Sequence, residues 1–225
     1  MKRNKIKQIF KYVLTLLVLI GIHHETSAKS FNNDCEALLH AVKNNNVKHV
    51  KTLLKSTSPD CLYQMSDPRT PLVMAAREGH LEIAKLLIEA GANVYKHASG
   101  DETPLMAASG NGNLGLVQLL ITKGASVNKR LSDNGTALLI AAKHGNTEVV
   151  SLLISKGLKV DEAIQGNGTP LICAVRNEHY DVAKILLEHG ANPNKISKGD
   201  ENAMYHAYAS NNKKMIELLS SYSKN

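Results

Sequence analysis

The sequence predicts an all-α fold, a solenoid of helix-turn-helix units with short β-hairpin-like turns, preceded by a cleavable signal peptide. Two observations support the solenoid: a short motif opening with Thr recurs every 33 residues, and paired leucines follow it at the same spacing. Composition agrees, since 43% of the 225 residues are hydrophobic and only 4% are aromatic. Such a chain can bury an aliphatic core, and it is too apolar for wholesale disorder.

The N-terminal residues 1–28 have the organisation of a secretory signal peptide. A basic stretch precedes an apolar run from Tyr12 to Ile22, and a polar tail ends at Ala28. The apolar run has 11 residues, whereas a membrane-spanning helix needs roughly 20. We expect cleavage after Ala28, with an uncleaved anchor as the alternative. The long basic stretch is typical of a bacterial leader, so the sequence predicts a periplasmic or secreted protein without a stable membrane anchor after cleavage.

Removal of the leader lowers the formal charge. The whole chain has 27 basic and 20 acidic residues, and the leader contains five of the basic residues and one of the acidic ones. The chain without the leader therefore has 22 basic and 19 acidic residues, a net charge of +3. Nucleic-acid binding needs Lys and Arg concentrated on one face, but here acidic residues are interspersed among them. We therefore expect no nucleic-acid partner.

Each repeated unit is predicted to be a helical hairpin. A Thr can cap the first turn of a helix, and Pro fits the first helical position because its missing N–H would be unpaired there. A second helix with one apolar face follows, and a Gly supplies the left-handed residue that ends it. The opening motif begins at Thr70, Thr103, Thr136, Thr169 and Asn202.

These units resemble the ankyrin repeat, whose signature has Thr-Pro-Leu at the first helix, a Gly between the helices and Gly-Ala after the second. The resemblance covers about residues 34–222, with departures at Ala137 and Leu158. Residues 29–33 form a short N-terminal segment, and the repeat domain spans 34–225. Its predicted repeats are about 34–64, 65–97, 98–130, 131–163, 164–196 and 197–225. The first and last repeats diverge, as caps that are polar outside and apolar inside.

The sequence predicts a disulfide for two of the three cysteines and a buried side chain for the third. Cys35 begins the first helix and Cys61 follows the second, and an antiparallel hairpin brings these positions together. We predict a disulfide between them, with two free thiols as the alternative. Cys173 occupies a core position that corresponds to Met74 and Ala107, so we expect it to be a small buried hydrophobe.

No catalytic or metal-binding motif is present in the sequence. It has no HExxH, no CxxC pair, no nucleophile elbow and no phosphate-binding Gly-rich loop with Lys. His80 and His179 occupy the usual His position after the inter-helix turn, which indicates a structural role. The acidic pairs Asp101-Glu102 and Asp200-Glu201 fall at hairpin tips. We predict no enzymatic activity, no cofactor, no metal and no small-molecule substrate.

The resemblance also implies a concave face, built from the hairpin tips and the exposed side of the first helices, with which ankyrin proteins hold other proteins. The candidate partner-binding residues of this face are Asp67, Arg69, Arg77, Glu78, His97, Asp101, Glu102, Asn111, Arg130, Asp133, Lys143, His144, Asn167, Arg176 and Asn177. Their mixed charge suits another folded protein, bound by a monomer.

The sequence therefore predicts a non-enzymatic protein-binding protein of the bacterial periplasm that binds and inhibits or neutralises an enzyme. Two alternatives remain open: a secreted effector that binds host proteins, and an envelope scaffold that supports a redox or other enzyme. The partner itself is not identified by the sequence.

Overall fold

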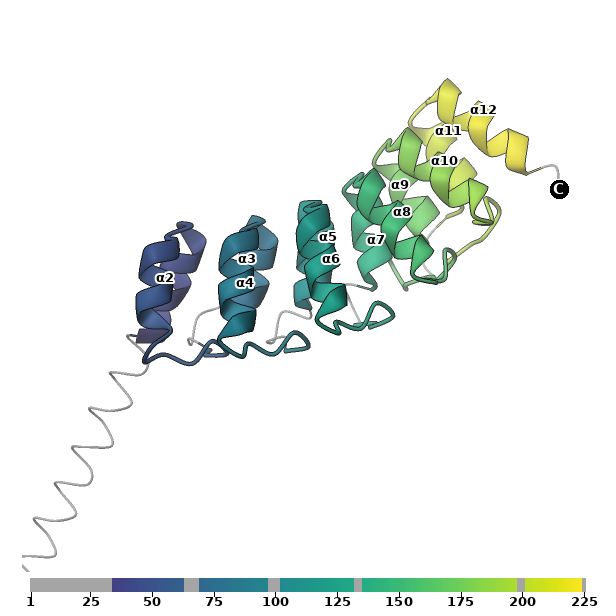
Figure 1. Cartoon of the computed structure of the whole chain (residues 1–225). Helices are drawn as coiled ribbons and strands as arrows, with labels where there is room; N and C mark the ends of the chain where they lie inside the picture. The colour runs from purple at the N-terminus through teal and green to yellow at the C-terminus, as the bar shows by residue number, and fades with distance from the viewer. Residues whose placement is uncertain (1–33, 63–68, 97–101, 132–134, 198–200, 224–225) are drawn as a thin grey trace, which may run out of the picture.

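The computed structural model describes residues 34–62, 69–96, 102–131, 135–197 and 201–223 (Figure 1). The predicted signal peptide and the segment 29–33 lie outside these ranges. In the described residues, a helix at 34–43 pairs with α2 (Val47–Leu53). The later pairs are α3 (Pro71–Glu78) and α4 (Leu81–Glu89), α5 (Pro104–Asn111) and α6 (Leu114–Thr122), α7 (Ala137–Lys143) and α8 (Thr147–Ser155), α9 (Pro170–Arg176) and α10 (Tyr180–Glu188), and α11 (Ala203–Ala209) and α12 (Lys213–Tyr222). None of the helices described here is long and apolar enough to cross a membrane.

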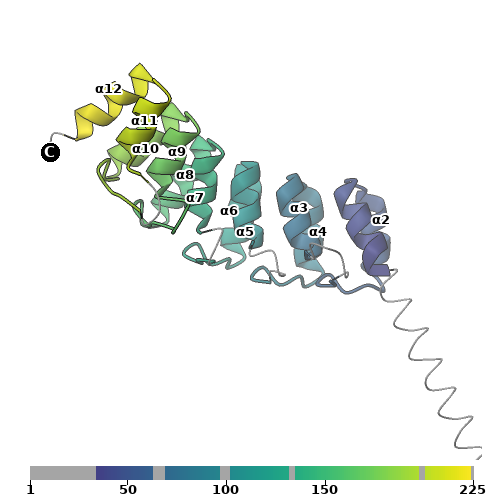
Figure 2. The ribbon, with the colours of Figure 1, turned by 180° about the vertical axis from the view of Figure 1, so that it is seen from behind.

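The helix pairs stack side by side into an elongated, curved array (Figures 1 and 2). The first helices of the units, α3, α5, α7, α9 and α11, form an inner row in which each contacts the next. The second helices form an outer row with looser contacts. Buried alanine pairs such as Ala75 and Ala76 let the inner helices approach closely. The predicted helical solenoid is therefore confirmed.

Threonine caps begin the inner helices, as the sequence predicts. The hydroxyl oxygens of Thr70, Thr103, Thr136 and Thr169 each accept a backbone N–H bond at 3.2 Å from the third residue of the following helix. Asn202 caps α11 in the same way, at 2.9 Å. The cap at Thr136 forms although Ala137 replaces the Pro of the motif. Proline at the first helical position only lacks an N–H that would be unpaired there, and it takes no part in the cap bond.

The turn between the two helices of a unit uses one residue with positive φ. Gly79, Gly112 and Gly145 have φ of 75°, 85° and 75°. Asn45, Glu178 and Asn211 take this conformation in the other units, with φ of 52°, 60° and 53°. Three consecutive asparagines, residues 44–46, lie at the turn of the first unit, and Asn45 is the one with positive φ.

A continuous core runs between the two rows. The leucine of each opening motif, as in Leu72 and Leu105, is almost completely buried. In the second, third and fourth units, the second of the paired leucines on the outer helix, such as Leu120, is fully buried, whereas the first, such as Leu119, is only partly buried. Hairpin-like turns are present where isolated antiparallel bridges join Leu131 to Gly135 and Ile164 to Gly168.

The two end units differ. In the first, Cys35 and Cys61 form a disulfide with their Cα atoms 5.8 Å apart, which ties the start of the first helix to the segment after α2. In the last, the expected polar outer side is wrong at two positions: Tyr205 and Tyr208 on α11 are 55% and 63% exposed. The corresponding positions on α9 are buried because α11 packs beside them, but among the described residues no further unit packs on the side of α11 that faces away from α9.

Candidate protein-binding surface

The predicted partner-binding residues come from the second to the fifth unit. Asp67, His97, Asp101 and Asp133 lie outside the described residues. Arg77, Lys143 and Arg176 lie at the same position near the ends of α3, α7 and α9, and all three are exposed on the inner row. Glu78, Asn111, His144 and Asn177 are the exposed residues that follow this position in their units.

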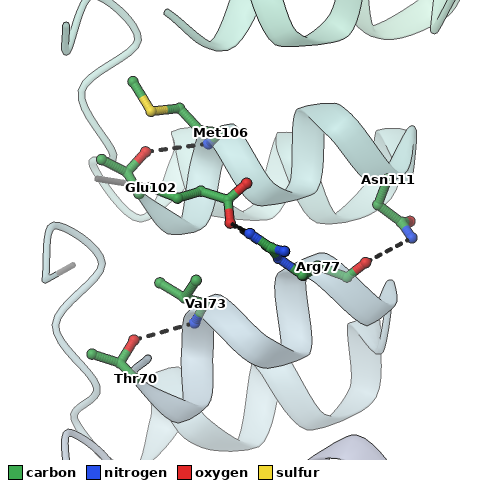
Figure 3. A network of polar contacts seen from close by, with 7 residues as sticks. Thr70, Val73, Arg77, Glu102, Met106 and Asn111 are labelled. Atoms are coloured by element: carbon green, nitrogen blue, oxygen red, sulfur yellow. Dashed lines mark hydrogen bonds and ion pairs between the residues drawn. The ribbon is translucent and has the colours of Figure 1, made fainter. Parts of the chain in front are cut away.

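Arg77 joins the second unit to the third. Its Nε donates to Oε2 of Glu102 at 3.1 Å, and its Nη2 makes an ion pair with the same carboxylate oxygen (Figure 3). The Asn111 side-chain amide donates to the Arg77 carbonyl oxygen at 3.1 Å. The Glu102 side chain is only 14% exposed, compared with 43% for Arg77. Solvent therefore screens this pair less than an ordinary surface pair, and it orients the guanidinium.

Five of the predicted residues line one depression on the inner surface. The depression has a volume of about 130 Å³, and its lining consists of Arg77, Glu102, Leu139, Ile140, Lys143, His144 and Asn167. Leu139 is buried and Ile140 is half-buried on α7, so they give the depression an apolar part. The structure thus brings residues from four successive units to one place.

Gly110 on α5 lies beside this depression. A Cβ added at Gly110 would be 3.1 Å from Cγ2 of Ile140 and 3.7 Å from Cδ2 of His144. The missing side chain lets the α7 residues approach α5. Sequence reasoning missed Gly110, Leu139 and Ile140 as parts of the site. The available signal was the 33-residue register, in which Gly110 falls between Arg77 and Lys143.

His144 has an altered proton affinity. Partial burial lowers the pKa of His144 below 6.5, and the nearby Lys143 and His179 lower it further, while Glu102 acts in the opposite direction. At neutral pH the imidazole is therefore uncharged. The positive charge of the depression then comes from Arg77 and Lys143, and Glu102 compensates one of the two.

The remaining predicted residues are separate from the depression. Arg130 pairs with Glu162 at 3.6 Å in a wide groove lined by loops of adjacent units. Arg69 is half-buried directly before the Thr70 cap. The Asn177 amide donates to the Cys173 carbonyl oxygen of its own helix at 2.8 Å, so Asn177 helps to end α9.

A column of His and Asn side chains connects the units. Nε2 of His179 lies 3.1 Å from the Lys143 carbonyl oxygen, and Nε2 of His80 lies 3.4 Å from that of Lys43. Asn146 donates to the Ser109 and Gly110 carbonyl oxygens at 2.7 and 2.9 Å. These bonds satisfy carbonyls at the ends of the preceding inner helices. The structural role predicted for His80 and His179 is therefore confirmed.

Cys173 is buried, as predicted, at 3% exposure, and its thiol donates to the Asn167 carbonyl oxygen at 3.0 Å. In the described part of the chain, no three His, Cys, Asp or Glu side chains gather as they would around a metal ion.

Stacked helix pairs, one continuous core and an inner row of polar side chains define a helical repeat protein of the solenoid class. A family model of ankyrin repeats (3 copies) matches residues 5–98, 38–131, 105–197 and 165–225. The chain therefore belongs to the ankyrin repeat family. No curated protein sequence matches it.

Among solved structures, the chain is similar to the human ASB11 ankyrin repeat domain. The two share 27% sequence identity and a TM-score of 0.75, and the match covers 84% of this chain and 84% of that one. Ankyrin repeats generally mediate protein–protein interaction, and the fold is typically a non-enzymatic scaffold. This chain is an ankyrin repeat protein, and protein binding is the general role of its family.

Proposed function

We propose that this protein is a monomeric, non-enzymatic binding protein of the bacterial periplasm that holds one folded enzyme on its inner face and neutralises it. The observation that carries the proposal is the convergence of Arg77, Glu102, Lys143 and His144 at one depression on the inner row. Residues from several units form one surface there, whereas no catalytic motif accompanies them.

Two features support export. Residues 1–28 have the sequence pattern of a signal peptide. The disulfide between Cys35 and Cys61 fits an oxidising compartment such as the periplasm, since cytosolic thiols are kept reduced.

The inner face suits a rigid partner because it is itself held in place. The Arg77–Glu102 pair and the His179–Lys143 bond each join neighbouring units across this face. A surface that is already ordered loses little conformational entropy when it binds. A standard interface of about 800 Å² per partner would occupy roughly three or four units.

The test is capture of the partner by the full chain, carrying a C-terminal tag and expressed in its own source. We expect one stoichiometric enzyme in the periplasmic eluate, and purified protein should abolish its activity. Lys143→Glu, on the inner row, should release the enzyme, whereas the matched Lys85→Glu on the outer helix α4 should retain it. Equal capture by both variants would contradict the inner-face assignment.

The other functions predict other results. Recovery of the protein from the culture medium with a bound host protein would favour an effector. A captured enzyme that keeps its activity would favour an envelope scaffold. Either result would overturn neutralisation while leaving protein binding intact.

A further inference from the structure

In the first five units, the inner row carries a column of positive charge with one gap. In the repeat register, the position of Arg77 corresponds to Lys43 in the first unit, Lys143 in the fourth and Arg176 in the fifth, and all four side chains are exposed. The third unit has Gly110 there instead. A basic residue thus flanks the gap on each side, from α3 and from α7.

Gly110 is not required by the backbone. It lies inside α5, and it is absent from the glycines with positive φ. A glycine in a helix costs roughly 0.5–1 kcal/mol relative to alanine. In exchange, Ile140 and His144 of α7, which line the 130 Å³ depression, approach α5 closely at this point. The depression is several times larger than the roughly 30 Å³ share of one liquid water, so it has room for a side chain.

The donors around the depression are suited to a carboxylate. No acidic side chain of the described residues makes an ion pair with Lys143, so its ammonium is available. Glu102 contacts Nε and Nη2 of Arg77, and a guanidinium has five N–H donors, so donors remain on the side away from Glu102. The apolar part, formed by Leu139 and Ile140, can contact the methylene groups of an incoming side chain.

We infer that this depression receives an Asp or Glu side chain from an acidic segment of the bound protein. The carboxylate lies between Lys143 Nζ and the remaining donors of Arg77, in the depression that both side chains line. The inference deepens the proposed function and rests on inner-face protein binding. Charge complementarity selects the occupant: the gap is flanked by two cations, and Glu102 already holds one of them in place.

A nucleic acid fits this site less well. A polyanion binds best along an uninterrupted row of basic residues, and here the row is broken at Gly110 and an acid stands beside the gap. A single carboxylate needs only the two cations that are present. Preference for an oligonucleotide is therefore an outcome that would overturn the inference.

The first experiment is an NMR titration of the ¹⁵N-labelled protein with three probes: a capped hexapeptide rich in Glu, the same peptide with Gln, and a single-stranded DNA hexanucleotide. We expect the Glu peptide alone to shift the amide signals of Gly110, Ile140 and Lys143. Lys143→Gln should weaken this binding about tenfold, as expected for loss of a hydrogen bond to a charged group, and the outer-row control Lys85→Gln should not. No shift at these residues, equal shifts with the Gln peptide, or stronger shifts with DNA would overturn the inference.

The second experiment displaces part of the lining, because a Cβ added at Gly110 lies 3.1 Å from Cγ2 of Ile140 and 3.7 Å from Cδ2 of His144. Gly110→Gln on α5 is compared with Gly115→Gln on α6, where an added Cβ meets its nearest atoms only at 3.5 Å. Both replace a helical glycine, so helical circular dichroism and the melting temperature verify folding in each. We expect Gly110→Gln to lose the Glu peptide and the captured partner, and Gly115→Gln to keep both. A partner retained by folded Gly110→Gln would refute the carboxylate site and leave the proposed function standing. Failure to find an enzyme would leave the peptide result unaffected.

Discussion

The substitution Gly145→Ala tests how neighbouring units are held together. Gly145 has φ 75°, where an L-residue with a Cβ is strained by about 1–2 kcal/mol. The new Cβ would lie 2.6 Å from Nδ1 and 2.7 Å from Cε1 of His179, so the imidazole must move. Movement breaks the 3.1 Å contact of His179 Nε2 with the Lys143 carbonyl oxygen, a loss of about 1 kcal/mol. Reduced freedom of the unfolded chain offsets about 0.5 kcal/mol. We expect a net loss of about 2 kcal/mol in the free energy of unfolding.

Gly157→Ala is the matched control. Gly157 has φ 82° and nothing within 4 Å of an added Cβ, so this variant carries the backbone strain without a collision. Urea unfolding followed by far-ultraviolet circular dichroism measures both, and Gly145→Ala should be the less stable by about 1 kcal/mol. In a His179→Ala background this excess should disappear, because the two changes act on the same contact. Equal destabilisation by the two glycine variants would refute the proposed role of His179.

Three further predictions concern other parts of the chain. Glu178→Gly should raise the stability by about 0.5–1 kcal/mol in the same urea assay, because Glu178 has φ 60° where three other units use Gly. Replacing Cys35 and Cys61 together by Ser should lower the free energy of unfolding by about 3 kcal/mol, since the disulfide spans 26 residues. Under reducing conditions the wild type and this variant should be equally stable. Because the pKa of His144 is lowered in the folded protein, the unfolded chain takes up a proton first as pH falls below 6.5, and stability decreases with acidification. His144→Asn should reduce this dependence of stability on pH, which is measured from melting temperatures between pH 7.5 and 5.

The fold was predictable because each unit repeats the same local chemistry. The Thr caps and the 33-residue spacing determine where the inner helices begin, and they are visible in the sequence without any long-range information. The degree of burial of individual side chains was less predictable from the sequence. Leu119 and Leu120 are adjacent on α6, and only the stacking of neighbouring units decides that Leu120 is fully buried and Leu119 partly buried. A charge at Leu120 is therefore the stronger disruption of the core.

The candidate site was only partly predictable, for a geometric reason. The repeat register places Arg77 and Lys143 on one face, although 66 residues separate them. The register does not show that the space between them is open. The absent side chain at Gly110 lets Ile140 and His144, two residues of the lining, approach α5, and a helix pattern indicates only a weak helix former at such a position. The depression becomes visible when α5 and α7 pack together.

Several predicted binding residues also hold the stack together, and this determines which of them can test function. Arg77 bonds Glu102 across a unit boundary, and its carbonyl accepts from Asn111. Arg77→Glu would place two carboxylates side by side and remove a contact between units, so lost binding could not be separated from lost stability. Lys143 makes no ion pair with the described residues, and its contact with His179 uses only the backbone oxygen. Because substitution of its side chain leaves that bond in place, Lys143 separates binding from folding.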